Sequence, residues 1–458
     1  MRRHPDMRRG PGESGFAMIT SVIVILMTAA LALIILTNGE HADRSSQRGR
    51  NWELAIQHAD AGVQQAVAKL QAGNGAVPAA FTGTTAEGSY SVTVTYLGRK
   101  RYQIDAQGFA GTHTSLAADR SVRVIYGPPR SFKYALFSLT DIDTKNNDTV
   151  DGDIWANGSV RVDQNDVITG SVNAATGWVF LDNGSSIAGD VVSGGYDPAT
   201  NRAVEVSTGA LIGGKVTAAS TVPGCTDDVA HSAYHVHAIG DITGTVKTWG
   251  VKTGGGSTGT VTTGVCSAAP ATKPMPTFTY NPANYSPPPI EFADVASFNA
   301  FVATTGTNLE GTYYVEGSGA IDLNGVTIAG DTTIIAVDAA IDAFGGVGIN
   351  AANNNDKILV LVSYYQPAAG TACTNNGGNP LDCAIGIKNN FQPENNTATL
   401  LYAPNGPVAF KNNAEFDGAV YANDIVLKNN MELVYDARVE QIIGFGSVSL
   451  ELESWVEV

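Results

Sequence analysis

An uncharged apolar run near the N-terminus constrains this chain more than any other feature. It extends from Phe16 to Leu36 without one charged side chain. A helix rises about 1.5 Å per residue, and about 20 apolar residues cross the hydrocarbon core of a bilayer. The sequence therefore predicts a membrane-spanning helix at this position.

Charge is distributed unevenly on the two sides of this run. Residues 1–15 contain four arginines and two acidic residues, whereas the whole chain carries a net charge of −16. A basic leader before an apolar span predicts that the leader stays in the cytoplasm and that the acidic body is exported. Because the body has no basic patch that would neutralise phosphates, we expect no nucleic-acid partner.

The residues after the apolar run separate a cleaved secretion signal from a longer helix. A secretion signal has about 7–15 apolar residues and then a small-residue cleavage site, and residues 36–40 fit such a site poorly. Apolar residues instead continue at helical spacing as Trp52, Ile56, Ala59, Val63, Ala66, Val67 and Leu70. The pattern predicts one long helix over 16–75, apolar first and amphipathic later; a plain uncleaved anchor stays open.

Gly15 and Phe16 lie at the junction between the polar leader and the apolar run. This junction resembles the processing site of type IV prepilins, where a membrane peptidase cuts between Gly and Phe on the cytoplasmic side. The resemblance implies a leader at 1–15 and a mature N-terminus at Phe16. Major pilins carry Glu at the fifth mature position, which here is Thr20. PilX-like minor pilins and K-type pseudopilins include members without this Glu, which are interpreted as tip or initiating subunits.

Residues 76–130 are predicted to form a small antiparallel sheet. Side chains alternate between β-branched and polar types over 90–97, 101–110 and 120–127, with glycines between the segments. The pair Pro128-Pro129 closes this region, because consecutive prolines cannot continue a ladder. A long helix on a small sheet resembles the layout of pilins.

The stretch 131–450 is predicted to be a solenoid of short strands. A unit of Gly, a polar residue and an aliphatic residue returns, its first three copies 18 and 19 residues apart, at Gly152, Gly170, Gly189, Gly214, Gly240 and Gly330. A second series, Lys-Asn-Asn, occurs at 388–390, 411–413 and 428–430, with an outlier at 145–147. Recurrence at about 20 residues is typical of stacked strands, with asparagines stacked at the corners.

The predicted fold class is thus α+β: a long N-terminal pilin-like helix with a small antiparallel sheet, then a right-handed parallel β-helix. A β-sandwich is the alternative. Residues 400–439 resemble the closing rungs of the C-terminal β-helix of PilX-like pilus assembly proteins. Residues 217–300 are expected to form an irregular insertion, with one short helix over 292–304.

Four cysteines, Cys225, Cys266, Cys373 and Cys383, are disulfide candidates, and none lies in a C-x-x-C pair. Proximity favours Cys373–Cys383 and Cys225–Cys266, although three pairings, and free thiols, stay open. A loop at 366–383 would be closed by the first of these bonds.

Histidines and aspartates provide weak candidates for metal ligands. His231, His235 and His237 are close in sequence, but they lie in a Gly-rich stretch that favours solvated loop histidines. Calcium-type oxygen ligands recur at Asp141, Asp143, Asp148, Asp151 and Asp153. The EF-hand spacing is absent, which favours solvated turn aspartates. We expect no metal and no cofactor.

No motif in the sequence supports catalysis. Some β-helices are polysaccharide lyases or hydrolases, which need clustered carboxylates, or calcium with a basic residue. Lysine and arginine are scarce after residue 130, and no nucleophile elbow, zinc-protease motif or phosphate-binding loop occurs. The chain is therefore not expected to be an enzyme, since fold alone does not imply activity.

The sequence favours a minor pilin-like structural subunit of a type IV pilus or related filament. It would sit at the tip and display its β-helix for adhesion or partner contact. Expected partners are other pilins, a prepilin peptidase, the inner-membrane assembly platform, and a surface or polysaccharide. The expected location is the inner membrane, with the body periplasmic or extracellular. Two alternatives stay open: a membrane-anchored carbohydrate-binding or carbohydrate-degrading β-helix, and a K-type-like pseudopilin of type II secretion.

Overall fold

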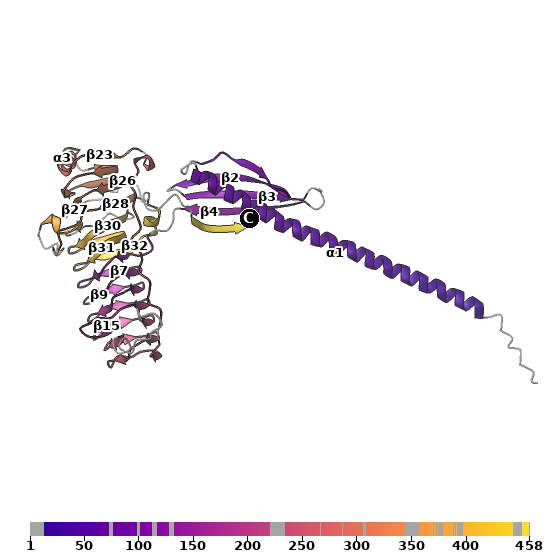
Figure 1. Ribbon diagram of the computed structural model, residues 1–458, viewed down its shortest axis with the longest axis horizontal. Coiled ribbons are helices and arrows are strands. Elements are labelled where there is room, and N and C mark those ends of the chain that lie inside the picture. The colour runs from indigo at the N-terminus through magenta and orange to yellow at the C-terminus, as the bar shows by residue number, and fades with distance from the viewer. Residues whose placement is uncertain are drawn as a thin grey trace, which may run out of the picture. The chain divides into compact units, whose positions relative to one another are not determined.

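The computed structural model divides the chain into two compact units (Figure 1). Unit 1 comprises residues 1–128 and 448–458, and unit 2 comprises residues 129–447. The structure describes residues 13–442 and 451–457 except for gaps at 73–76, 99–100, 112–116, 128–131, 220–233, 266, 286, 306–307, 344–356, 370, 372, 374–378, 388, 390 and 392–396.

Unit 1 is built on one long helix, α1 (Glu13–Ala72), as the spacing of apolar residues predicts. In its C-terminal half, buried residues recur at steps of three and four positions: Ala55, Ala59, Val63, Ala66 and Leu70. Trp52 differs from the prediction, since it is 52% exposed beneath the Arg120 guanidinium, 4.4 Å from the ring centre. His58 on the same helix is buried, with Nδ1 3.0 Å from Thr85 Oγ1.

The buried face of α1 packs on an antiparallel sheet of five strands. Its strands are β1 (Phe81–Thr84), β2 (Gly88–Gly98), β3 (Arg101–Ala110), β4 (Ala118–Gly127) and β33 (Glu451–Glu457). The three predicted strands are confirmed. The fifth strand, β33, was not predicted and pairs with β4 from the far end of the chain. It follows the predicted solenoid at 131–450 and belongs to unit 1.

The first half of unit 2 consists of short strands that turn around a common core. They are β5 (Leu136–Ser138), β6 (Ile142–Asp143), β7 (Thr149–Asp151), β8 (Ile154–Ala156), β9 (Val160–Val162), β10 (Val167–Ile168), β11 (Val172–Ala174), β12 (Val179–Leu181), β13 (Ser186–Ile187), β14 (Val191–Ser193), β15 (Arg202–Val206), β16 (Leu211–Ile212), β17 (Val216–Ala218), β18 (His235–Ala238), β19 (Asp241–Ile242), β20 (Val246–Thr248), β21 (Lys252–Thr253) and β22 (Val261–Thr263).

Each strand from β5 to β18 pairs in parallel with the third strand after it, so that three strands make one coil of the stack. Ile154 pairs with Val172, and Val172 pairs with Val191. The recurrence of the Gly-polar-aliphatic unit in the sequence is therefore one coil. Alternate side chains of these strands point inward and form one continuous aliphatic core, as a period of two requires.

The recurring Gly-polar-aliphatic unit marks a corner where successive coils approach closely. Asp153 Oδ1 accepts a hydrogen bond from Ser171 N at 2.7 Å, and Asp190 N donates to Ser171 Oγ at 3.2 Å. A Cβ added to Gly170 would lie only 2.3 Å from the Gly152 carbonyl oxygen. The unit thus combines a residue without a side chain, for close approach, with a polar side chain that bonds the neighbouring coil.

The second half of unit 2 has longer strands and a short helix. They are β23 (Ile290–Phe292), α3 (Val295–Thr305), β24 (Asn308–Val315), β25 (Gly319–Asp322), β26 (Thr327–Ala336), β27 (Ala339–Ala343), β28 (Lys357–Ser363), β29 (Ile385–Ile387), β30 (Thr397–Phe410), β31 (Glu415–Val426) and β32 (Glu432–Tyr435), with short 3-10 turns at Pro282–Asn284, Pro380–Asp382 and Ala437–Gln441. The predicted helix is confirmed as α3, which buries Val295, Phe298 and Val302 in the core.

The order of coils in space does not follow the order in the chain. Strand β31 pairs in parallel with β5 and β6, and β32 pairs with β7. The last coil, residues 415–435, therefore stacks directly on the first coil, residues 136–151. Figure 1 shows this contact, which we call the seam, where yellow strands lie beside magenta ones. Residues 400–439 are thus not closing rungs, because they lie in the interior of the stack.

A ladder of asparagines crosses the seam. Asn430 Nδ2 donates to Asn413 Oδ1 at 3.2 Å, Asn147 Nδ2 to Asn430 Oδ1 at 3.4 Å, and Asn165 Nδ2 to Asn147 Oδ1 at 3.3 Å. All four residues have φ between 60° and 63°, the left-handed region that asparagine tolerates. The predicted stacking of asparagines is confirmed. The outlying Lys-Asn-Asn at 145–147 is the step of the ladder that follows 428–430.

The two halves of the stack are connected by an extended segment, the strap, residues 267–285. Lys273 N donates to Asn157 Oδ1 at 2.9 Å, and Asn157 Nδ2 donates to Lys273 O at 2.8 Å. Further along, Tyr402 Oη donates to Pro276 O at 2.5 Å. The strap is thus attached to the outer face of coils on both sides of the seam.

The predicted irregular insertion at 217–300 is wrong for much of its length. Strands β17 to β22 continue the stack from residue 216 to residue 263, in register with the coils before them. Insertions between strands make these coils unequal in length, which hides the repeat in the sequence. Among the described residues of 217–300, the strap leaves the stack.

Candidate functional site

The exposed N-terminal half of α1 is the main candidate site. Residues 18–36 are all exposed, and their large side chains include Leu31, Leu33 and Leu36, each more than half exposed. Among the described residues, α1 is the one helix long and apolar enough to cross a membrane. The backbone of Gly15 and Phe16 lies within α1, but their side chains fall outside the described residues.

Hydroxyl groups in this apolar half bond to the helix itself. Ser21 Oγ donates to Met18 O at 2.8 Å, and Thr28 Oγ1 donates to Val24 O at 2.9 Å. Such bonds satisfy the hydroxyls without a partner outside the helix. Thr20, at the position where major pilins have Glu, is exposed. The segment therefore presents an uncharged apolar surface that an aqueous protein would not leave uncovered.

One of the two favoured disulfides is present. Cys373 is bonded to Cys383, and both side chains are buried beside Ala409. This bond closes the loop between β28 and β29. Cys225 and Cys266 lie outside the described residues, so their pairing stays a prediction.

Two of the histidines, His235 and His237, lie on a strand and not in the predicted loop. His235 and His237 are two residues apart on β18. They face away from the core, because the alternating residues Val236 and Ala238 are buried in it. His235 Nδ1 accepts from Val251 N at 3.2 Å, and His237 Nδ1 lies 2.9 Å from Thr253 Oγ1. Burial, with the nearby Arg202 charge, lowers the pKa of His237. Within the described ranges no group of three metal-ligating side chains converges, and His231 lies outside them.

The aspartates of the first coil bond to backbone and side-chain groups, Asp141 and Asp151 on the next coil and Asp143 within its own coil. Asp141 Oδ1 accepts from Ser159 N at 2.6 Å, in the same manner as Asp153. Asp151 is exposed and accepts from the Thr169 hydroxyl. Asp143 pairs with Lys145 at 2.7 Å. Asp141 and Asp151 thus bond the next coil, which accounts for their recurrence along the chain.

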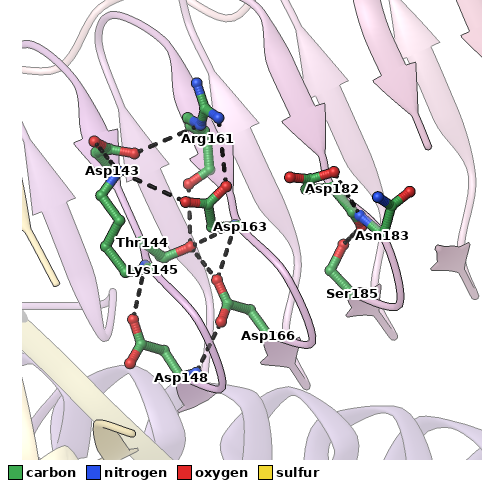
Figure 2. A network of polar contacts seen from close by, with 10 residues as sticks. All are labelled: Asp143, Thr144, Lys145, Asp148, Arg161, Asp163, Asp166, Asp182, Asn183 and Ser185. Carbon is green, nitrogen blue, oxygen red and sulfur yellow. Dashed lines mark hydrogen bonds and ion pairs between the residues drawn. The ribbon is translucent and has the colours of Figure 1, made fainter. Parts of the chain in front are cut away.

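Asp148 contradicts the prediction of solvated turn aspartates, since it is only 1% exposed (Figure 2). Its Oδ1 accepts from Met431 N across the seam, and its Oδ2 accepts from Lys145 N, both at 2.9 Å. Asp148 N donates to Asp166 Oδ1 at 2.8 Å. Asp166 Oδ2 in turn accepts from Asp163 N at 2.9 Å and from Thr144 Oγ1 at 2.5 Å.

All four carboxylate oxygens of this pair have donors, and both side chains are closed to solvent. Burial raises the pKa of Asp148 to about 8 and that of Asp166 to about 7, although their hydrogen-bond donors act in the opposite direction. Because no substrate can reach these oxygens, the pair has a structural role: it bonds the first coil to the last coil and to the second.

We expect the free energy of unfolding to fall by about 1–3 kcal/mol between pH 6 and pH 8.5. Both carboxyls have a folded pKa above the ordinary value of 3.8, so the folded state binds more protons than the unfolded chain between these values. Their stabilisation is complete below about pH 3.8, decreases as pH rises above that value, and is lost once pH passes the folded pKa values of about 7 to 8. Urea unfolding at the two pH values measures the difference.

The variant Asp148→Asn removes one titrating group, so its stability should change less over this interval. Asp151→Asn, at an exposed aspartate of the same coil, is the matched control and should keep the full decrease. An equal pH dependence in wild type and Asp148→Asn would contradict the assignment.

Asp166 was not predicted as the partner of Asp148. A signal was present, because Asn147-Asp148 and Asn165-Asp166 repeat the same dipeptide one coil apart. Each asparagine takes the left-handed corner, and each aspartate follows it into the interior. In both coils the aspartate that follows the corner asparagine is buried, and it is not a turn residue exposed to solvent.

Comparisons with known proteins add little about function. Residues 289–442 match the family model described as "Domain of unknown function (DUF7305)", which is about a third of the chain, from β23 to the last 3-10 turn. Among curated proteins no relative matches. A crystal structure of the competence-associated pilin ComZ from Thermus thermophilus is similar at 13% identity and a TM-score of 0.20, covering 89% of this chain and 97% of that chain. A TM-score this low does not establish a shared fold.

Proposed function

We propose that this chain is a minor pilin-like subunit, of the PilX-like kind, in a type IV pilus or related filament, with a structural rather than enzymatic role. The observation that carries the proposal is the division of α1 into two halves. Residues 18–36 are apolar and exposed, whereas Ala55 to Leu70 pack on the sheet of unit 1. Such a helix suits a subunit that leaves the bilayer by packing its apolar half against other pilins.

Packing between such helices needs close contact, since lipid tails are as apolar as the side chains themselves. Ala29, Ala30 and Ala32 provide small, exposed residues at the centre of the apolar half. They permit close approach of a neighbouring helix, which increases dispersion contacts. Polar residues then follow from Asn38 onward, where the helix would leave the bilayer.

Thr20 supports a place at the tip or in initiation rather than in the shaft. A carboxylate within lipid is costly unless it is paired, so a Glu at this position favours a subunit that docks onto a neighbour's N-terminal amine. Thr20 carries no charge to pair in this way. We also propose the prepilin peptidase and the inner-membrane assembly platform as partners of this subunit during assembly.

For unit 2 we propose a right-handed parallel β-helix that the subunit displays outside the inner membrane for contact with a surface, a polysaccharide or a partner. The parallel pairing of every third strand supports this architecture. In a stack of this kind each coil bonds the next along one axis, so that unit 2 can act as a spacer.

N-terminal sequencing of the mature protein tests the proposal. The full chain is expressed in a host with and without a prepilin peptidase, and the expected result is a start at Phe16 only when the peptidase is present. A leader that stays intact with the peptidase, or a start after Leu36, would contradict it.

Two leader variants make the test specific. Gly15→Val should abolish cleavage, because it changes the residue before the expected cut, whereas Gly12→Val in the same leader should be processed as wild type. Equal processing of both variants would show that cleavage does not depend on the Gly15–Phe16 junction.

A further inference from the structure

A pocket lies on the outer face of unit 2. It lies over β9, β12 and β15, which pair in parallel so that Arg161, Phe180 and Glu205 are neighbours on successive coils. The aliphatic residues that flank them are buried in the core. The pocket has a volume of about 290 Å³, with walls formed by these residues and by Trp178, Val179, Asp197, Thr200 and Arg202.

One wall of the pocket is a hairpin that interrupts the coil between β14 and β15. Asp197 N donates to Arg202 O at 2.8 Å, and Asn201 closes the turn with φ of 58°. Asp197 Oδ1 accepts from Ala199 N at 3.0 Å, and its Oδ2 accepts from Thr200 Oγ1 at 2.8 Å. The rim is therefore held in shape by its own hydrogen bonds before any ligand binds.

The floor of the pocket is aromatic. Trp178 and Phe180 meet edge to face, with ring centres 6.3 Å apart, and both are half-buried. The Arg161 guanidinium lies over the Phe180 ring at 5.1 Å. Half-buried rings on the outside of a stack leave apolar surface that a ligand with C–H groups can cover.

Charge in the pocket is balanced. Arg202 pairs with Glu205. Arg161 pairs with Asp163 at 3.4 Å and lies 3.9 Å from Asp143, and Figure 2 shows both contacts of Arg161. Two guanidinium groups and two carboxylates line the pocket, so it has no net charge to attract an anion such as phosphate. It offers fixed donors and acceptors beside an aromatic surface.

We propose that this pocket binds one ring of a neutral saccharide. A pyranose presents C–H groups on one face, which fit the rings of Trp178 and Phe180. Its hydroxyls can donate to Asp197 and Glu205 and accept from Arg161 and Arg202. The volume is at the lower end of the range of about 300–1,000 Å³ typical of small-molecule sites, which limits the ligand to about one or two rings.

The binding measurement uses the full chain in a detergent without sugar headgroups. Methyl glycosides of glucose, galactose, mannose and N-acetylglucosamine are the probes, with inorganic phosphate as the anionic comparison, in saturation-transfer NMR. At least one glycoside is expected to bind, and phosphate is not. Absence of binding by all four glycosides, or preferential binding of phosphate, overturns the proposal.

Variants locate the bound sugar. Trp178→Ala and the isosteric Glu205→Gln should each weaken binding about tenfold or more, since each removes a main contact. The matched controls Val167→Ala and Lys247→Gln change exposed residues outside the pocket and should bind as wild type. If Glu205→Gln and Trp178→Ala both bind as wild type, the site is elsewhere and the proposal fails. This result is independent of leader cleavage, so it does not affect the test of the proposed function.

Discussion

Replacing Tyr421 by alanine is expected to lower the free energy of unfolding of unit 2 by about 3–5 kcal/mol. Tyr421 is 1% exposed and lies on β31 at the seam, where its register partner is Phe137 of β5. Its ring stacks on Phe137 with ring centres 5.1 Å apart and meets Phe132 edge to face at 4.6 Å. Removal of the ring leaves a cavity between the two halves of the stack.

The companion variant Tyr421→Phe separates packing from hydrogen bonding. Tyr421 Oη accepts from Tyr134 N at 3.0 Å, and loss of this acceptor should cost about 1–3 kcal/mol while the ring contacts remain. Guanidinium unfolding of the full chain, followed by circular dichroism in the β region, measures both variants. A loss below about 1 kcal/mol for Tyr421→Ala would show that the seam does not hold the two halves together.

Gly418→Ala is expected to destabilise unit 2 by about 3 kcal/mol or more. Gly418 lies on β31 opposite Thr399, with φ of 149°, which side chains rarely tolerate. A Cβ at this position would lie 1.9 Å from the Thr399 carbonyl oxygen, a backbone atom that cannot move without breaking the ladder. The loss therefore comes from both strain and forced separation of two coils.

Gly255→Ala is the matched control for this prediction. Gly255 lies in a turn of the same unit with no atom within 4 Å of an added Cβ and without a positive φ. Alanine there should be neutral, or stabilise by about 0.4–1 kcal/mol, because it restricts the unfolded chain. Equal destabilisation by the two substitutions would contradict the argument from close approach.

The prediction of a stacked body succeeded because its signals are local and repeated. Each coil needs a residue without a side chain where backbones approach, as at Gly170, and a left-handed corner, as at Asn147. Both requirements recur once per coil and are therefore visible in the sequence as a regular period. The same periodicity failed beyond residue 217, where insertions between strands change the length of each coil.

Burial at the seam could not be predicted from neighbouring residues. Asp148 has the local sequence of a turn aspartate, and only the stacking of residues 415–435 on 136–151 closes it from solvent. The outlying Lys-Asn-Asn at 145–147 was the one trace of this contact, because Asn147 bonds Asn430. A partner 283 residues away leaves no local periodicity.

By itself, the sequence determined an apolar helix able to span a bilayer, an amphipathic continuation, a small antiparallel sheet and a repeating body of short strands. These follow from patterns within one element or one coil, where side-chain spacing alone selects the inward face. Tertiary structure alone decided the order of the coils, the path of the strap, the return of β33 to unit 1 and the pocket at Trp178 and Phe180. Each of these depends on which distant segments pair, and pairing energy comes from contacts that no single stretch of the chain contains.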